Sequence, residues 1–175
     1  LIRPDFLIAV GQKWLMGPHQ LSYLYVSPKR QQGRPIEYNW VNRAGAEDHS
    51  RLADYTDDFQ PGARRYDGGA RGNPLAIPMA RAALAQISAW GVAEIAATVR
   101  PMIAEIAEGA EALGLKPTPA PVRAPHFIGL RAPGGLPPGL AEGLAAANVH
   151  ISIRGESIRV APNVYNDAGD IERLF

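Results

Sequence analysis

The chain begins with two apolar runs separated by turn-forming residues. The first run, Phe6–Val10, is closed by Gly11, and the second run, Leu21–Ser27, is closed by Pro28. A short continuous apolar run bounded by turn residues is typical of a buried strand. Residues 11–20 contain a Gly-Pro turn signal and are expected to form a loop. We therefore predict two strands joined by this loop, with the first strand buried.

Residues 28–76 have little apolar periodicity. They carry charges of both signs and repeated Gly and Pro, and a structureless stretch of this length is uncommon in a compact domain. Four aromatic residues argue against plain disorder: Trp40, Tyr55, Phe59 and Tyr66. We expect this segment to be ordered mainly by contact with a second subunit.

The following segment has the spacing of helices. Ile77–Trp90 is rich in alanine and is followed by Gly91. From Val92 to Leu113 the apolar residues recur at gaps of three and four, which predicts one apolar stripe along a second helix. Pro101 lies inside this helix and is expected to kink or divide it, because proline has no backbone donor.

Short strands and helices follow a proline-rich connector. The predicted strands are 126–131, 149–154 and 157–161, and the predicted helices are 136–147 and one that begins near Asn166 or Asp167. This order suggests a small α+β layer domain with its helices on one face of a sheet. The pattern divides the chain into three parts, 1–76, 77–114 and 115–175.

Composition narrows the classes of function. The chain has 175 residues, of which 46% are apolar and 20% are charged, as in a globular protein. A net charge of +1 gives no reason to expect nucleic acid or an anionic membrane as a partner. Without cysteine there is no disulfide, thiolate nucleophile or cysteine metal site, and we expect no metal. No apolar run approaches the roughly 18 residues of a membrane span and no signal peptide is evident, so we expect a cytoplasmic protein.

Lys13 is the first candidate for chemistry. The chain uses arginine for most of its cations, yet it keeps a lysine directly after an apolar strand. Such an amine should emerge at the carboxyl end of the strand, where α/β folds place ligands. A lysine amine that is removed from water can form a Schiff base with an aldehyde cofactor. The alternative is a surface lysine on a loop.

Three segments together resemble a known family. They are Asp5–Pro18 with its Lys-Trp-Leu-x-Gly-Pro turn, Tyr66–Asn73, and Ile153–Pro162 followed by Tyr165-Asn166. In this order they resemble the cofactor-lysine, aromatic-acid-x-Gly and C-terminal segments of the class V aminotransferases, which are fold-type I pyridoxal-phosphate enzymes. The resemblance implies an α/β fold, with the end of the large-domain sheet followed by a small C-terminal α+β domain.

The resemblance also implies roles around the cofactor. Lys13 would hold pyridoxal phosphate as a Schiff base and shuttle a proton at the substrate Cα. Gln12 stands near the expected cofactor phosphate, and Arg71 and Asn73 lie in a region that reaches the phosphate of the neighbouring subunit of a homodimer. The alternatives are a solvated loop amide at position 12 and a helix-initiating turn at 71–73.

Substrate binding is implied further along the chain. Arg159 matches the arginine that binds the substrate carboxylate, a task that needs two parallel donors on a planar group. Arg154 is a weaker rival for this role, and His19 could stack or hydrogen-bond near the site. The alternatives are a strand-edge arginine in an ordinary ion pair and a loop histidine without a role.

Several features depart from the family pattern. Relatives commonly have glycines near the positions of Gln20 and Ser22. The segment between Arg154 and Arg159 lacks the longer loop that carries the desulfurase cysteine, and the chain has no cysteine, so we do not expect a persulfide-forming desulfurase. In the family, the phosphate cup, the ring-stacking aromatic residue and the aspartate paired with the pyridine nitrogen all precede the lysine.

Two hypotheses follow from this pattern. In the first, the chain is the C-terminal part of a pyridoxal-phosphate enzyme that acts on an amino acid by transfer, lysis or epimerisation, and it is inactive without the N-terminal half. In the second, it is a truncated or degenerate segment that packs and dimerises without binding cofactor.

Overall fold

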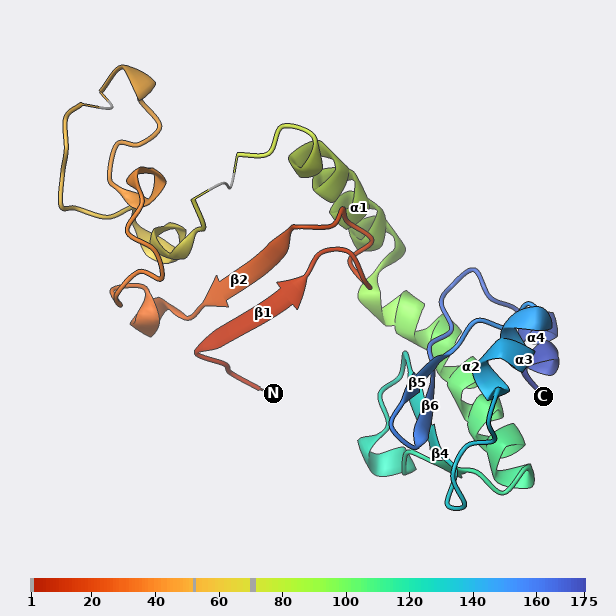
Figure 1. Cartoon of the computed structure of the whole chain (residues 1–175). Coiled ribbons are helices and arrows are strands. Elements are labelled where there is room, and N and C mark those ends of the chain that lie inside the picture. The colour runs from red at the N-terminus through yellow and green to blue at the C-terminus, as the bar shows by residue number, and fades with distance from the viewer. Residues whose placement is uncertain (1, 52, 70–71) are drawn as a thin grey trace. The chain divides into compact units, whose positions relative to one another are not determined.

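A computed structural model describes residues 2–51, 53–69 and 72–175. The chain forms two compact units, Leu1–Ala89 and Trp90–Phe175. Each unit has its own antiparallel sheet, with two strands in the first and four in the second (Figure 1). The division into three parts predicted from the sequence stays a prediction.

The first unit opens with a two-stranded ribbon. Strand β1 (Phe6–Val10) pairs with β2 (Ser22–Val26), so that Phe6 lies opposite Val26. Both predicted strands are confirmed, but the predicted burial of the first strand is wrong. The side chains of Leu7 and Ile8, which point to opposite faces, are 51% and 74% exposed. A strand buried on both faces needs a covering layer on each side, and the described part of the chain does not supply these layers.

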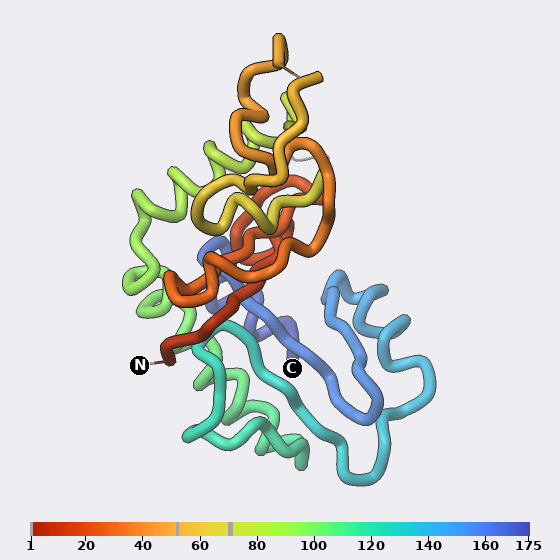
Figure 2. Tube along the Cα trace, turned by 90° about the vertical axis from the view of Figure 1, so that its left-hand side faces the viewer, coloured from red at the N-terminus to blue at the C-terminus, as the bar shows by residue number. Residues whose placement is uncertain are grey.

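The described residues between 28 and 75 follow an irregular path, drawn in orange and yellow in Figure 2. Their regular pieces are short 3-10 turns: η1 (Pro28–Arg30), η2 (Trp40–Asn42), η3 (His49–Arg51) and η4 (Gly62–Tyr66). The buried residues among those described in this segment include Val41, Asn42, Gln60 and Tyr66. The segment therefore has contacts of its own, and the role of a second subunit in ordering it stays a prediction.

Two helices follow, as predicted. Helix α1 spans Ala76–Trp90 and α2 spans Val92–Ala112 without interruption, so Pro101 does not divide it. Pro101 and Ala97 are both exposed, which leaves the Ala97 carbonyl, deprived of its helical donor, in contact with water. Within the described residues no single helix is long and apolar enough to span a membrane, although α1 and α2 taken together meet the criteria of length and composition.

The second unit is built on a sheet with the strand order β3-β4-β6-β5. Its elements are β3 (Lys116–Pro117), β4 (Ile128–Arg131), α3 (Leu140–Ala146), β5 (Ser152–Arg154), β6 (Ser157–Val160) and α4 (Ala168–Leu174). Strand β3 was not predicted, because a strand of two residues is too short to show a period. The other elements are confirmed with shorter bounds, and Asp167 is the N-cap of α4.

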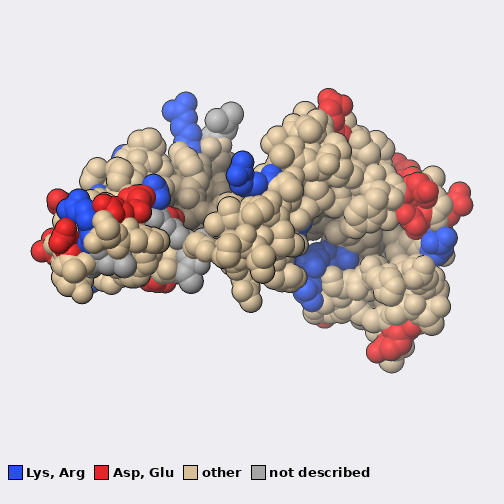
Figure 3. Space-filling model, turned by 90° about the horizontal axis from the view of Figure 1, so that it is seen from above, with Lys and Arg blue, Asp and Glu red and all other residues tan. Residues whose placement is uncertain are grey.

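In the second unit, helix α2 packs against one face of the sheet. The buried sheet residues are Ile128 and Leu130 of β4 and Ile158 of β6. Helix α2 contacts β3 and β4, and its own buried stripe is formed by Val99, Ile103, Ile106, Ala107 and Ala110. The predicted α+β layer is thus confirmed. On the face of the molecule drawn in Figure 3, charged side chains of both signs stand in small groups between wide uncharged areas.

Candidate functional site

Lys13 lies in a turn that closes on itself directly after β1. The N–H of Gly11 donates to the carbonyl of Leu21 at 2.8 Å, which continues the pairing of the two strands. The N–H of Gly17 donates back to the carbonyl of Gly11 at 2.8 Å, and the N–H of Met16 donates to the carbonyl of Lys13 at 2.9 Å. These bonds hold the backbone of residues 11–17 in a compact bend, with Lys13 near its beginning.

The two glycines of this turn are required by space. A Cβ atom on Gly11 would lie 2.9 Å from the Leu21 carbonyl oxygen, and one on Gly17 would lie 3.1 Å from the Gly11 carbonyl oxygen. Both obstacles are backbone atoms of the turn itself, which cannot swing aside as a flexible side chain does. The close approach of the two ends of this turn therefore explains why residues 11 and 17 are glycines.

The side chain of Lys13 is exposed and has no ion pair or hydrogen bond within the described residues. The expectation of an amine removed from water is therefore not met in this chain, because the strand before it is itself uncovered. Lys29 differs, since its Nζ lies 2.7 Å from Asp5 Oδ1. Of these two lysines, Lys13 is the one whose amine remains available to a ligand.

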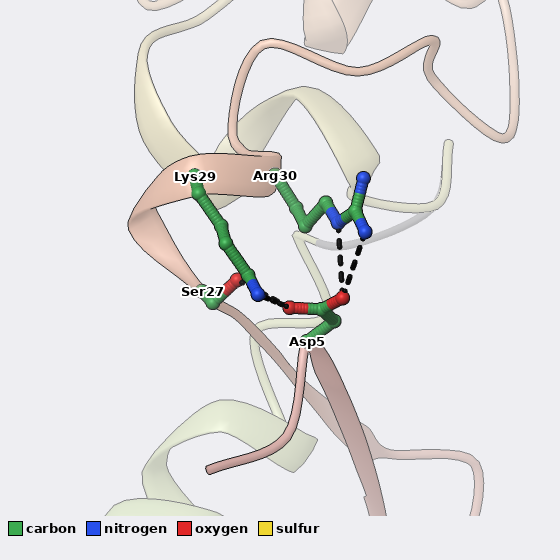
Figure 4. A network of polar contacts seen from close by, with 4 residues as sticks. All are labelled: Asp5, Ser27, Lys29 and Arg30. Atoms are coloured by element: carbon green, nitrogen blue, oxygen red, sulfur yellow. Dashed lines mark hydrogen bonds and ion pairs between the residues drawn. The ribbon is translucent and has the colours of Figure 1, made fainter.

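Asp5 anchors the beginning of β1 to the turn after β2 (Figure 4). Its carboxylate contacts Lys29 and accepts hydrogen bonds from Arg30 Nε at 3.1 Å and Nη2 at 2.9 Å. The backbone N–H of Ser27 also donates to the Asp5 carbonyl at 2.9 Å. The hydrogen bonds from Lys29 and then Arg30 hold the pKa of Asp5 below its usual value. Asp5 thus fastens the two strands together at the end of the ribbon opposite to Lys13.

The other predicted residues of the first loop differ in exposure. Gln12 is half-buried beside Lys13, and His19 is exposed. Gln20 has a φ of 71°, in the left-handed region that favours glycine. This is one of the two positions at which relatives were expected to have glycine, so the departure from the family pattern leaves a strained residue next to His19.

The glycine-rich segment after Tyr66 leads into α1. Asn73 Oδ1 accepts hydrogen bonds from the N–H groups of Leu75 at 3.0 Å and Ala76 at 2.9 Å, so Asn73 starts the helix. Pro74 has no N–H and cannot donate to an anion. The Oδ1 atom of Asn73 is already engaged with the helix, so its Nδ2 group is the part of the side chain that can donate to an anion. Arg71, the other residue predicted here, lies outside the described residues.

The predicted substrate arginines lie on the second unit. Arg159 in β6 and Arg154 in β5 project from the sheet face opposite the buried one. Arg159 Nη2 donates to Ser152 Oγ at 3.1 Å, and Arg154 Nη1 donates to the carbonyl of Ile153 at 3.2 Å. Neither guanidinium pairs with a carboxylate of the described residues, so the alternative of an ordinary ion pair for Arg159 is not observed. Arg131, on the same face, does have such a pair, with Glu156 at 3.2 Å.

Sequence reasoning missed Glu37. Its carboxylate accepts hydrogen bonds from Gly69 N–H and Asn39 Nδ2, both at 3.0 Å, and so connects the irregular segment to the glycine-rich one. Glu37 stands in a stretch without periodicity or a motif, and no sequence signal could have identified it.

No family model matches the sequence, and no curated protein matches it. The fold, however, is similar to that of solved structures. The apo cysteine desulfurase from Thermococcus onnurineus NA1 is 20% identical with a TM-score of 0.77, and the match covers 97% of this chain and 45% of that chain. The cystine C-S lyase C-DES, in complex with its product cysteine persulfide, is 18% identical with a TM-score of 0.76 over 97% and 45% of the two chains.

A third similar structure is an aspartate aminotransferase of subgroup IV from Thermus thermophilus. It is 19% identical with a TM-score of 0.59, and the match covers 97% of this chain and 46% of that chain. The chain thus spans about 45% of the length of the structures that it matches, and it has the fold of the C-terminal part of pyridoxal-phosphate aminotransferase-like structures. The predicted fold class is confirmed.

Proposed function

We propose that the chain is the C-terminal part of a pyridoxal-phosphate-dependent enzyme that acts on an amino acid. One observation carries the proposal: the exposed amine of Lys13, without an ion pair in the described part of the chain, stands on a glycine-closed turn at the end of β1. The fold supports it, because a similar structure is a Lys-to-Ala variant of C-DES with glycine covalently linked to its pyridoxal-phosphate cofactor, at a TM-score of 0.67 and 18% identity.

The residues present fit this cofactor. An aldehyde requires an accessible amine, and Lys13 provides one, whereas Lys29 is engaged by Asp5. The phosphate requires donors, which the Gln12 amide and Asn73 Nδ2 can supply, and Arg71 belongs to the same proposal. When it is bound, pyridoxal phosphate supplies the electron sink that makes bonds at the substrate Cα reactive.

The residues of the chain then have separate tasks. The Lys13 amine would hold the cofactor aldehyde, and the same amine would move a proton at the substrate Cα. Arg159 orients the substrate by giving two parallel N–H groups to its α-carboxylate, and Arg154 is the second candidate for this contact. His19 is proposed as a neighbour of the substrate. The reaction is a transfer, a lysis or an epimerisation.

The proposal includes further parts of the protein. The uncovered faces of β1 and the match to about 45% of the similar structures favour a missing N-terminal half that completes the cofactor site. We also infer a class V aminotransferase-like homodimer in the cytoplasm. Since the chain has no cysteine, it supplies no thiol for a persulfide, and a desulfurase that uses a cysteine of this segment is disfavoured.

The test uses the full-length protein. Borohydride reduction followed by peptide mapping should place a pyridoxyl group on Lys13. Lys13→Ala should abolish the adduct and the visible absorbance of the bound cofactor, and the matched variant Lys29→Ala should keep both. An adduct on Lys29 or Lys116 would show that the lysine is wrongly assigned. A protein that gives no adduct at all would favour the alternative of a non-catalytic segment.

A further inference from the structure

Glu37 connects two segments that are far apart in the sequence. One oxygen of its carboxylate, Oε2, accepts from the backbone N–H of Gly69 at 3.0 Å and from Asn39 Nδ2 at 3.0 Å. A Cβ atom on Gly69 would lie 3.4 Å from this same oxygen, and one on Gly68 would lie 3.9 Å from Oε1. The carboxylate therefore lies directly against the backbone of the glycine-rich segment.

Two asparagines support Glu37 from the other side. Asn42, which is fully buried, donates through Nδ2 to the Glu37 carbonyl at 3.0 Å, and Asn39 donates to the carboxylate. Among the described residues, the buried Oδ1 atoms of Asn39 and Asn42 have no hydrogen-bond partner. A buried unpaired oxygen is unfavourable, and in this arrangement each amide spends its hydrogen bond on Glu37 through Nδ2. The main chain and the side chain of Glu37 are thus both fixed.

The fixed residue stands just ahead of the proposed phosphate-binding residues. Gly69 is separated by three positions from Asn73, which starts α1. Glycines have no side chain to hold their backbone in one conformation, so a segment with glycine at 68, 69 and 72 needs an external contact. The described structure supplies this contact at Gly69 through Glu37.

We propose that Glu37 is a positioning residue for phosphate binding, because it holds the backbone at Gly69 in the glycine-rich part of the chain that precedes Asn73. This inference rests on the proposed function. Glu37 acts through the backbone and does not contact the phosphate, which its negative charge would repel. Its effect is therefore confined to ligands that carry the phosphate group.

The experiment compares two ligands on the full-length protein. Apparent dissociation constants are measured for pyridoxal 5'-phosphate and for pyridoxal, which lacks the phosphate. Glu37→Ala should weaken pyridoxal-phosphate binding by about tenfold, as expected for a lost charge-assisted hydrogen bond, with pyridoxal binding unchanged. Glu37→Gln should have a smaller effect, because its amide oxygen can still accept from Gly69. The control is Glu105→Ala, an exposed carboxylate on α2.

A second readout is independent of the cofactor. The Gly69 amide should exchange with solvent faster in Glu37→Ala than in the wild type, and Glu105→Ala should leave this rate unchanged. An equal loss of affinity for both ligands would assign Glu37 to general stability and overturn the inference. Unchanged affinity for pyridoxal phosphate would overturn it as well. If the wild-type protein binds neither ligand, the proposed function itself fails, and this inference fails with it.

Discussion

The ring of Phe6 meets the ring of Tyr66 edge-on, with 6.2 Å between the ring centroids and 85° between the planes. Phe6 belongs to β1 and Tyr66 to η4, so this contact connects the ribbon with the end of the irregular segment. The hydroxyl of Tyr66 also donates to the carbonyl of Arg30. One buried side chain thus holds together three stretches of the first unit.

Removing the Tyr66 hydroxyl should therefore reduce stability. Tyr66→Phe keeps the ring contact but deprives the Arg30 carbonyl of its donor, and we expect the free energy of unfolding to fall by about 1 kcal/mol. The matched control is Tyr55→Phe, because Tyr55 is 94% exposed and should lose nothing. Denaturant titration checks both variants, and equal stabilities for the two would contradict this role of Tyr66.

Gly11→Ala should destabilise the lysine turn. Its Cβ would come 2.9 Å from the Leu21 carbonyl oxygen, so the backbone pairing of the two strands must shift, at a cost of about 1–3 kcal/mol in unfolding free energy. Gly143→Ala is the control, because Gly143 lies within α3 with nothing within 4 Å of an added Cβ. That change should stabilise the chain by about 0.5–1 kcal/mol. A stabilising Gly11→Ala would contradict the described turn.

Gln20→Gly should relieve strain. At a φ of 71°, a residue with a side chain destabilises the folded state by about 1 kcal/mol relative to glycine. Glycine also makes the unfolded chain more flexible, which offsets part of this gain. The free energy of unfolding should therefore rise by about 0.5 kcal/mol. Ser22→Gly is the comparison, because Ser22 is the first residue of β2 and glycine weakens strands. The two substitutions should therefore have opposite signs in thermal unfolding, and equal signs would refute the strain at Gln20.

The titration of Asp5 should follow its two cations. The folded-state pKa lies below the usual 3.8, so Asp5 stabilises the fold above about pH 4, and this contribution is lost as the pH falls through the folded pKa. Lys29→Ala and Arg30→Ala should each raise the pKa of Asp5, because each removes a hydrogen bond and a positive charge from its carboxylate. Carbon NMR of the Asp5 carboxyl measures this. Arg51→Ala, which removes a cation paired elsewhere, with Asp54, should change nothing.

Arg159→Ala should weaken substrate binding in the full-length enzyme. The substitution removes two parallel charged hydrogen bonds to the substrate. The activation free energy calculated from kcat/KM should therefore rise by on the order of 2–5 kcal/mol. Arg159→Lys should be nearly as harmful, because an ammonium keeps the charge but not the two parallel donors. Cofactor absorbance should survive both changes. If kcat/KM stays within about twofold, a difference under roughly 0.5 kcal/mol, Arg159 is structural and Arg154 becomes the residue to test.

Periodic features of this fold could be predicted from the sequence. The three-and-four spacing of α2 identified its buried stripe, including Val99 and Ile106, because the same residues must face the sheet at every turn. The strand predicted over 157–161 is found as β6, where buried Ile158 stands next to exposed Arg159, the alternation of a strand with one covered face. Both patterns are found where helix and sheet of the second unit cover each other, so the burial does not depend on another part of the protein.

Other features depend on partners that the sequence does not identify. The apolar run of β1 indicates that Ile8 belongs in an interior, but it does not say which part of the protein covers it. The order within residues 28–76 comes from single long-range contacts, such as Tyr66 with Arg30 and Glu37 with Gly69, which leave no period to detect. The lysine turn was recognised by its resemblance, whereas the spatial reason for its two glycines emerged from the structure.

The ribbon of β1 and β2 also affects how this segment behaves when it is separated from a covering layer. In the described residues β1 pairs with β2 alone, so its outer backbone edge offers unpaired N–H and C=O groups alongside exposed Phe6, Leu7 and Ile8. An open, apolar strand edge is a template onto which an identical strand from another molecule can add. Concentrated preparations of this segment by itself should therefore aggregate through β1, and a charged residue at Ile8 should delay that aggregation.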